Sequence, residues 1–291
     1  MDSTTPLISV LMTVYNREKY ISEAIESVIS STYQNWELII VDDQSKDRSV
    51  EIARSYEAKD NRIKVYVNEK NLGQFPNRNK AASLAIGEYI KYLDSDDIIY
   101  PHGLEVMVSS IEKFPNAGVA ICQSSPDIKQ PYPLLIDSKN ALIEHFNGTK
   151  IFNAGPSSCI FNKDAFNYVN GFRIDNYVGN DTLLFLDIAK YYPVLKIPNA
   201  LIWWRRHEGQ EFINGQNSNT YFIFDFNKQV EFILDPEINF SKNERKKLFK
   251  SYFNMRIGQI ISKAFKNGKF ILSYKAFIVS RMNLAKLLYK Y

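Results

Sequence analysis

The chain has 291 residues, of which 45% are apolar, enough for one large domain or for a domain with an appendage. No stretch reaches the roughly 18 uncharged apolar residues of a membrane span, and the first residues lack the basic and apolar regions of a signal peptide. The two cysteines, Cys122 and Cys159, fit neither a zinc pattern nor a disulfide framework, so we expect a reducing, cytoplasmic setting.

The net charge of +4 hides a division between the body of the chain and its tail. Residues 241–291 hold 13 Lys and Arg side chains and one acid, a charge of +12, so the other 240 residues carry −8. Such a tail predicts contact with an anionic surface, either a membrane or a nucleic acid. The simpler alternative is a pair of helices that pack on the domain and keep their lysines in solvent.

Apolar runs of strand length alternate with stretches of helical periodicity through the first hundred residues. The predicted strands are 7–15, 36–41, 63–67 and 88–93, and the predicted helices are 22–31, 50–56 and 78–86. The strand runs are continuous rather than alternating, which indicates burial on both faces, as in a parallel sheet. Strands that alternate with helices therefore predict an α/β fold with a doubly wound sheet.

Polar side chains follow three of these strands at the point where each strand ends. The fourth strand runs into Asp94, Asp96 and Asp97, and the second ends at Asp42 and Asp43. The first delivers three further polar side chains, Thr13, Tyr15 and Asn16. Ligands bind at the carboxyl ends of strands in such sheets, and carboxylates this close repel one another. The sequence therefore predicts a site at this edge that calls for a cation.

Two blocks of the sequence resemble the inverting glycosyltransferases of family 2. The first is PLISVLMTVYNREKYISEAIESVISSTYQNWELIIVDDQSKDRS, and the second is NEKNLGQFPNRNKAASLAIGEYIKYLDSDD, which ends in an Asp-x-Asp motif. The Gly-x-Gly-x-x-Gly and Gly-x-x-x-x-Gly-Lys motifs of other nucleotide-binding folds are absent. The resemblance covers roughly residues 6–215.

The resemblance implies a GT-A fold, which is Rossmann-like, with a mostly parallel central sheet flanked by helices. We expect residues 1–215 to form the glycosyltransferase domain, with 6–97 as its nucleotide-sugar half and 98–215 as its acceptor half. A basic helical extension would follow at 216–291.

The resemblance also assigns roles at matching positions. The residues expected to bind the nucleotide sugar are Thr13, Tyr15, Asn16, Asp43, Arg78, Asp94 and Asp96. The expected metal ligands are Asp96, Asp97 and His207. Carboxylate oxygens suit Mg²⁺ or Mn²⁺, which typically bind through one or two carboxylates together with phosphates. A bound metal would assist the departing diphosphate.

Inversion at the sugar also needs a general base for the acceptor hydroxyl. The segment NYVGNDTLL resembles the acidic acceptor motif of the family, usually Glu-Asp before a helix. Asn180 replaces the first acid, but Asp181 keeps the second, which serves as the base in the family. The alternative for Asp181 is a plain helix cap.

These features predict an enzyme that moves a sugar from a nucleotide-diphosphate sugar to an acceptor hydroxyl, in bacterial surface polysaccharide synthesis. The acceptor would be a glycan or a lipid-linked glycan, and the enzyme would work in the cytoplasm at the inner face of the membrane. One alternative is a metal-dependent nucleotidyltransferase, whose sheet and acids can look similar. Another is a nucleic-acid-binding protein that acts through the tail, although the charge of −8 on the body argues against nucleic acid.

Overall fold

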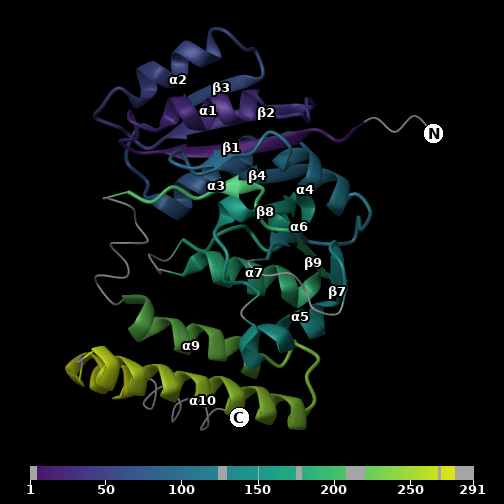
Figure 1. Cartoon of the computed structure of the whole chain (residues 1–291), viewed down its shortest axis with the longest axis vertical. Helices are drawn as coiled ribbons and strands as arrows, with labels where there is room; N and C mark the ends of the chain where they lie inside the picture. Colours follow the sequence, from purple (N-terminus) through teal and green to yellow (C-terminus); the bar gives the residue numbers. More distant parts are fainter. Residues whose placement is uncertain are drawn as a thin grey trace. The chain divides into compact units, whose positions relative to one another are not determined.

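The structure is a computed structural model that describes residues 5–123, 130–149, 151–174, 179–207, 220–267 and 270–278. The chain divides into two compact units. The first consists of Met1–Ser138, Phe152–Asn176 and Asn180–Arg205, and the second of Lys139–Ile151, Tyr177–Gly179 and Arg206–Tyr291. Figure 1 shows the chain from its N-terminus in purple to its C-terminal helices in yellow.

The first unit is built on an eight-stranded sheet with the strand order β3-β2-β1-β4-β8-β6-β9-β7. Its first four strands are β1 (Ile8–Val14), β2 (Trp36–Asp42), β3 (Ile63–Val67) and β4 (Tyr89–Tyr92). These four are parallel to one another, with Thr13 opposite Val41 and Leu11 opposite Tyr92. The prediction of a parallel sheet is confirmed for this half, where the carboxyl ends of the strands share one edge.

The other half of the sheet mixes directions. Its strands are β6 (Val119–Cys122), β7 (Leu134–Ile136), β8 (Cys159–Asn162) and β9 (Val194–Ile197). Strand β8 is antiparallel to β4 and β6, β6 and β9 are parallel, and β7 is antiparallel to β9. A small antiparallel pair, β5 (Ile98–Ile99) with β10 (Ile202–Trp203), follows the acidic loop and holds the chain near residue 205 against it.

Helices cover both faces of this sheet (Figure 1). They are α1 (Ile21–Ile29), α2 (Ser49–Glu57), α3 (Gln74–Leu84), α4 (Gly103–Ile111), the 3-10 turn η2 (Pro156–Ser158), α6 (Lys163–Tyr168) and α7 (Asn180–Tyr191). Helix α1 buries Ile21, Ala24, Ile25 and Val28, a helical period, against a core that includes Val10 and Met12 of β1. The expected fold class, a mostly parallel sheet flanked by helices, is confirmed.

The second unit is helical. It contains most of α5 (Ser138–Glu144), the π-turn η1 (His145–Thr149), α9 (Thr220–Leu234), α10 (Lys242–Asn267) and a further helical stretch at 270–278. Its core holds Phe226 stacked on Tyr252, with ring centroids 5.2 Å apart, and Phe146 against the edge of Tyr252. The expected C-terminal helices are therefore present. Across the described residues, no helix combines the length and the apolar character needed to cross a membrane.

Candidate active site

The residues that follow β1 form the first wall of the site. Thr13 is half-buried at the end of the strand, and Tyr15 is exposed beyond it. Asn16 has a φ of 53°, in the left-handed region that Asn tolerates better than most side chains. Its side-chain oxygen accepts a hydrogen bond from the backbone of Lys46 at 2.8 Å, and its own N–H donates to Ser45 at 2.8 Å. The loops after β1 and β2 are thereby tied together.

Asp43 lies buried at the end of β2 and organises the Asn71-Leu72-Gly73 segment. One carboxylate oxygen accepts hydrogen bonds from the Asn68 side chain and the Leu72 N–H, each at 2.8 Å, and the other accepts from the Gly73 N–H at 2.8 Å. A carboxylate offers about four acceptor positions, so this network leaves room for about one further donor. That capacity fits the expected contact with a base N–H.

The acidic loop after β4 turns tightly. The Asp97 N–H donates to the Asp94 carbonyl at 2.9 Å, and the Ser95 hydroxyl donates to the Thr13 carbonyl at 3.0 Å. Asp96 and Asp97 are buried, whereas the Asp94 side chain is one-third exposed. The ends of β1 and β4 are thus joined directly, and the carboxylates gather at the predicted edge of the sheet.

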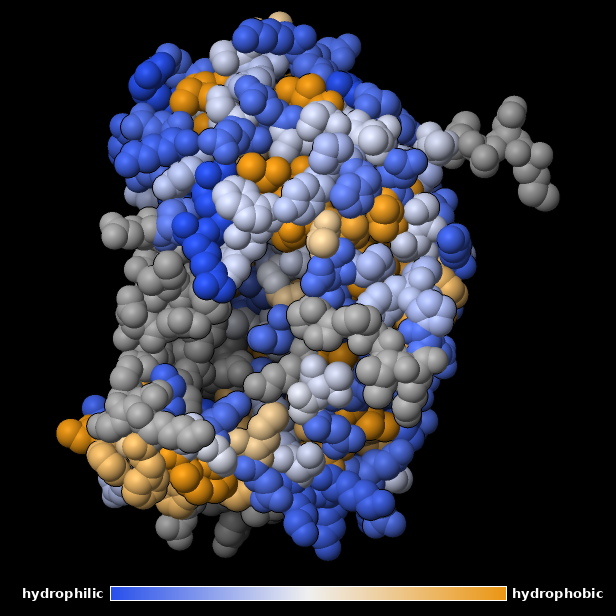
Figure 2. All heavy atoms as spheres, viewed as in Figure 1, coloured by the Kyte–Doolittle hydropathy of each residue, from blue (hydrophilic) through white to orange (hydrophobic). Residues whose placement is uncertain are grey.

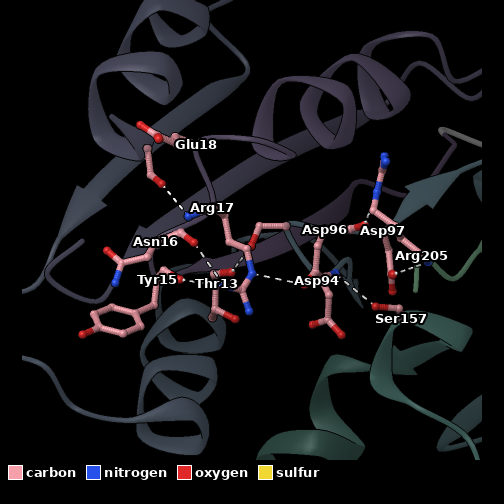
Figure 3. Close-up of polar contacts among 12 residues, drawn as sticks. Thr13, Tyr15, Asn16, Arg17, Glu18, Asp94, Asp96, Asp97, Ser157 and Arg205 are labelled. Carbon is pink, nitrogen blue, oxygen red and sulfur yellow. Dashed lines mark hydrogen bonds and ion pairs between the residues drawn. The ribbon is translucent and has the colours of Figure 1, made fainter. Parts of the chain in front are cut away.

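Arg17 provides the first positive partner of this loop. Its Nε lies 3.1 Å from a carboxylate oxygen of Asp96, and its Nη1 donates to the carbonyls of Tyr15 and Asn16 at 3.2 and 3.1 Å. Figure 3 shows the Arg17 side chain between the residues that follow β1 and the acidic loop. Arg17 thereby neutralises Asp96, which the family resemblance predicts to bind both the nucleotide sugar and the metal.

Arg205 meets the loop from another side. Its backbone N–H donates to Asp97 at 3.2 Å, its Nε donates to the Asp96 carbonyl at 2.9 Å, and its Nη2 forms an ion pair with Glu23 at 2.6 Å. Because the guanidinium contacts the loop backbone and Glu23, Arg205 fixes the shape of the loop. Figure 3 shows Arg205 beside Asp97.

Lys91 lies completely buried in β4, three residues before the first carboxylate. Its ammonium donates to the carbonyls of Tyr92, at 2.5 Å, and of Ser157. Burial lowers the pKa of Lys91 to about 8, while acidic neighbours that include Asp94 and Asp97 act in the opposite direction. A buried cation on the strand that leads into the acidic loop thus interacts with the charges of its carboxylates.

Arg78, on α3, is the fourth cation. Its Nη2 lies 2.6 Å from Asp94, and its guanidinium carbon lies 5.5 and 5.8 Å from the rings of Tyr92 and Phe172. Its Nε and Nη1 are buried and meet no hydrogen-bond partner among the described residues. Burial acts to lower the pKa of Arg78, but the charges of Asp94 and Asp181 outweigh it and raise the pKa.

Asp181 occupies the first turn of α7, where the partial positive charge of a helix N-terminus favours a carboxylate. Its Oδ1 is buried and accepts no hydrogen bond from any residue that the structure describes. Burial raises the pKa of Asp181 to about 6, Arg78 opposes this rise, and Asp94 adds to it. Asp181 and Asp94 therefore lie within the field of the same arginine.

Asp97 is the carboxylate of the loop that burial and neighbouring like charges disfavour most in its ionised form. Burial and the neighbouring charges of Asp94 and Asp96 hold its pKa well above the usual range of a carboxyl group. An oxygen-seeking cation would relieve that cost. Taken over the described ranges, no three His, Cys, Asp or Glu side chains are grouped so as to hold a metal. His207 is half-buried and belongs to the second unit, so its assignment as a ligand stays a prediction.

The structure therefore gathers the expected residues of the first unit around one edge of its sheet. Sequence reasoning missed three of the four cations, namely Arg17, Lys91 and Arg205 in its backbone role. For Lys91 a signal existed, because a lysine inside the apolar run YIKYL has no solvent to reach from a buried strand.

Comparison with known proteins gives a consistent result. The sequence model described as Glycosyl transferase family 2 matches residues 9–169. A relative from Escherichia coli, named UDP-Glc:alpha-D-GlcNAc-diphosphoundecaprenol beta-1,3-glucosyltransferase WfgD, is 42% identical over 107 residues, 37% of this chain and 42% of that protein. Across the first three curated relatives, the matched region spans between 38% and 54% of their length.

Solved structures share the fold at low sequence identity. TarS residues 1–349 from S. aureus has a TM-score of 0.72 and 19% identity, and the match covers 96% of this chain and 80% of that one. A mannosyltransferase from Pyrobaculum calidifontis, solved in complex with GDP-Man and Mn²⁺, has a TM-score of 0.62 and 15% identity, over 98% of this chain and 86% of that one. At these identities the likeness concerns the fold alone.

Proposed function

Because this chain is a glycosyltransferase that belongs to glycosyl transferase family 2, we propose that it transfers a sugar with inversion from a nucleotide-diphosphate sugar to an acceptor hydroxyl. Family membership decides against the nucleotidyltransferase and nucleic-acid-binding alternatives. The observation that carries the proposal is the 2.6 Å ion pair of buried Arg78 with Asp94, together with the buried Asp181 carboxylate, whose pKa Arg78 acts to lower. The expected base and the donor-side acid thus belong to one electrostatic unit.

The donor would bind along the carboxyl ends of β1, β2 and β4. Tyr15 and Thr13 would flank the nucleotide base, and Asp43 has one acceptor position left for a ring N–H. Asp94 and Asp96 would contact the ribose and sugar hydroxyls. Arg78 would act on the donor through Asp94, because its other nitrogens are buried.

A divalent cation fits the residues of the acidic loop. Asp96 and Asp97 offer hard oxygen ligands, and the raised pKa of Asp97 indicates a carboxylate that ionises at a cost unless a cation is near. Two carboxylates suffice in principle, since Mg²⁺ and Mn²⁺ take their other ligands from phosphates and water. Bound there, the ion would neutralise the departing diphosphate. His207 is proposed as a further ligand.

Asp181 would take the proton of the acceptor hydroxyl as that oxygen attacks the anomeric carbon. With a pKa of about 6, the carboxylate is largely ionised at neutral pH and yet more basic than an exposed aspartate. Burial therefore makes Asp181 a stronger base, and Arg78 limits the rise of its pKa so that most of the carboxylate is ionised at neutral pH. In-line displacement by one oxygen inverts the configuration of the sugar.

The setting of the reaction is also proposed. The name of the E. coli relative specifies a diphosphoundecaprenol-linked acceptor, which supports a lipid-linked glycan as the acceptor and surface polysaccharide as the product. The enzyme would then work in the cytoplasm at the inner face of the membrane. The charge of +12 on residues 241–291 supports contact with an anionic membrane surface.

A donor screen tests the proposal. The purified chain would be melted with a panel of nucleotide sugars, each with and without Mn²⁺, and every stabilising donor would then be assayed for hydrolysis and transfer. We expect one nucleotide class to raise the melting temperature in a Mn²⁺-dependent manner. No stabilisation by any nucleotide sugar in Mn²⁺ would refute the proposed donor site.

A further inference from the structure

The C-terminal helices of the second unit expose large apolar side chains. Those exposed within residues 261–277 are Ile261, Phe265, Phe270, Ile271, Tyr274 and Phe277. Phe265 is 75% exposed and Ile271 77%, and the rings of Phe265 and Phe270 meet edge to face at 5.6 Å, which joins the end of α10 to the helical stretch after it. In Figure 2 this surface is the orange area over the C-terminal end of α10 and the helical stretch after it. We call these six residues the apolar tip.

A single outward stripe of α10 leads to the apolar tip. Its exposed positions, three or four residues apart, are Lys247, Lys250, Asn254, Gly258, Ile261 and Phe265. Side chains at this spacing lie on the same face of a helix. The stripe is therefore basic at its start and apolar at its end. Figure 2 shows the same change, from blue to orange, along the face of α10.

The inner face of α10 is already occupied. Leu248, Tyr252, Ile260 and Ala264 are buried, and Tyr252 donates to Gln229 of α9 at 2.8 Å. The helix thus has a partner within its own unit, which accounts for its buried apolar residues. The apolar tip lies outside that packing, and its exposure is left to be explained.

Scattered exposed apolar residues are ordinary, but a contiguous aromatic surface beside lysines marks an interaction site. Ile86 of the first unit is 72% exposed, and among the described residues no other exposed large apolar side chain occurs between Val67 and Tyr100. Aromatic rings with nearby cations match the boundary of an anionic bilayer, where rings enter the headgroup region and lysines meet lipid phosphates. The excess of cations in residues 241–291 complements that surface rather than an apolar protein groove.

We propose that the apolar tip inserts into the headgroup region of an anionic lipid bilayer, while Lys247 and Lys250 lie along its surface. This inference rests on the membrane contact proposed above and assigns it to particular side chains. It does not depend on sugar transfer, because the residues involved lie outside the acidic loop and the base. Insertion would place the second unit on the surface that holds a lipid-linked acceptor.

Sedimentation of the full chain with vesicles tests the assignment. One set of vesicles contains phosphatidylcholine with phosphatidylglycerol, and the other contains phosphatidylcholine alone. The apolar variant is Phe265→Ser with Phe270→Ser, and the charge variant is Lys247→Gln with Lys250→Gln. Ile86→Ser is the control, because it removes from the first unit an apolar side chain about as exposed as Phe265.

The apolar variant should bind both kinds of vesicle about tenfold or more weakly than the unchanged chain, since two rings no longer leave water. The charge variant should lose about tenfold or more on anionic vesicles only, and added salt should remove that difference. The control should bind like the unchanged chain.

Equal vesicle binding by the apolar variant and the unchanged chain would overturn the proposal. So would a dimer, measured by light scattering, that the apolar variant dissociates while vesicle binding is unaffected, because the tip would then serve a second copy. Since serine is tolerated on an exposed helix face, the variants should keep the unchanged thermal melt. Ile271→Ser provides an independent substitution in the same surface. If no nucleotide sugar stabilises the chain but vesicle binding depends on the apolar tip, the membrane proposal is supported and the proposed donor site is refuted.

Discussion

Replacing Arg78 with methionine should move the pH dependence of sugar transfer. Methionine keeps much of the length and apolar packing between Tyr92 and Phe172, but it removes the positive charge that Asp94 and Asp181 share. A base works only when it is deprotonated, so the rate rises with pH through the pKa of Asp181. Burial raises that pKa to about 6, and Arg78 opposes the rise. Loss of Arg78 should therefore raise this pKa and move the acidic limb of the pH–rate profile, where the rate rises with pH, to higher pH.

The size of the shift follows from the contacts. An opposite charge nearby typically lowers the pKa of a carboxyl group by roughly 1–3 units, so the limb should move from about 6 to roughly 7–9. At pH 7 the ionised fraction of Asp181 would fall from about nine tenths to between about one half and one hundredth. We expect a loss of about twofold to ninetyfold at that pH, most of which returns as the pH is raised.

The assay is the pH profile of kcat/KM for transfer, with donor affinity measured separately at each pH. Arg78→Lys keeps a positive charge and should shift the limb less than methionine. Asp94→Asn removes a like charge and should move the limb toward lower pH, the opposite sign. An unshifted limb in Arg78→Met, together with a large rise in the KM for the donor, would refute the reasoning and mean that Arg78 binds the donor directly.

Three further substitutions test other parts of the account. Asp97→Asn should abolish Mn²⁺-dependent binding of nucleoside diphosphate without loss of the fold, and unchanged affinity by calorimetry would show that the metal lies elsewhere. Arg17→Ala should do the reverse and tighten Mn²⁺ binding severalfold, because the cation paired with Asp96 is removed; weaker binding would contradict this. Gly87→Ala should lower the free energy of unfolding by roughly 1–3 kcal/mol in a urea titration, since its new Cβ would lie 2.5 Å from the Leu7 carbonyl oxygen; an unchanged midpoint would count against this packing.

The parallel half of the fold could be predicted because its strands are buried on both faces. Strand β3 has the predicted bounds, β1 is shorter than predicted by one residue at each end, and β2 is longer by one residue at its C-terminal end. Helix α3 begins at Gln74, four residues earlier than predicted, and its first turn contains Pro76. Proline reads as a helix breaker, but it is tolerated in the first turn, where the N–H groups have no partner within the helix.

The mixed half of the sheet and the separate β5–β10 pair carried a weaker signal. Strands β5 and β10 have two residues each and β7 has three, too few for any hydrophobic period to show. Their partners come from distant parts of the chain, as in the pairing of β10 with β5. Tertiary contacts rather than local sequence determine such strands.

The site, too, has one part that the sequence predicts and one part that it does not. Its carboxylates stand at strand ends, so the fold itself predicts that they meet, and the resemblance to a family gives them roles. The cations that balance them come from positions 17, 78, 91 and 205. Only Lys91 is close to the loop in the sequence, and no spacing links the three arginines to it. Only the folded chain shows that Arg78 couples Asp94 to Asp181.

The most direct test of the central claim is sugar transfer by Asp181→Asn, with NMR of the product made by the unchanged chain. Asparagine preserves the shape of the side chain but cannot accept the proton of the acceptor. General-base catalysis contributes roughly 10²–10⁴-fold, so transfer should fall by about that factor while donor affinity stays nearly the same. The product should carry the anomeric configuration opposite to that of the donor. Turnover near that of the unchanged chain would exclude Asp181 as the base, and a product of retained configuration would contradict the proposed mechanism itself.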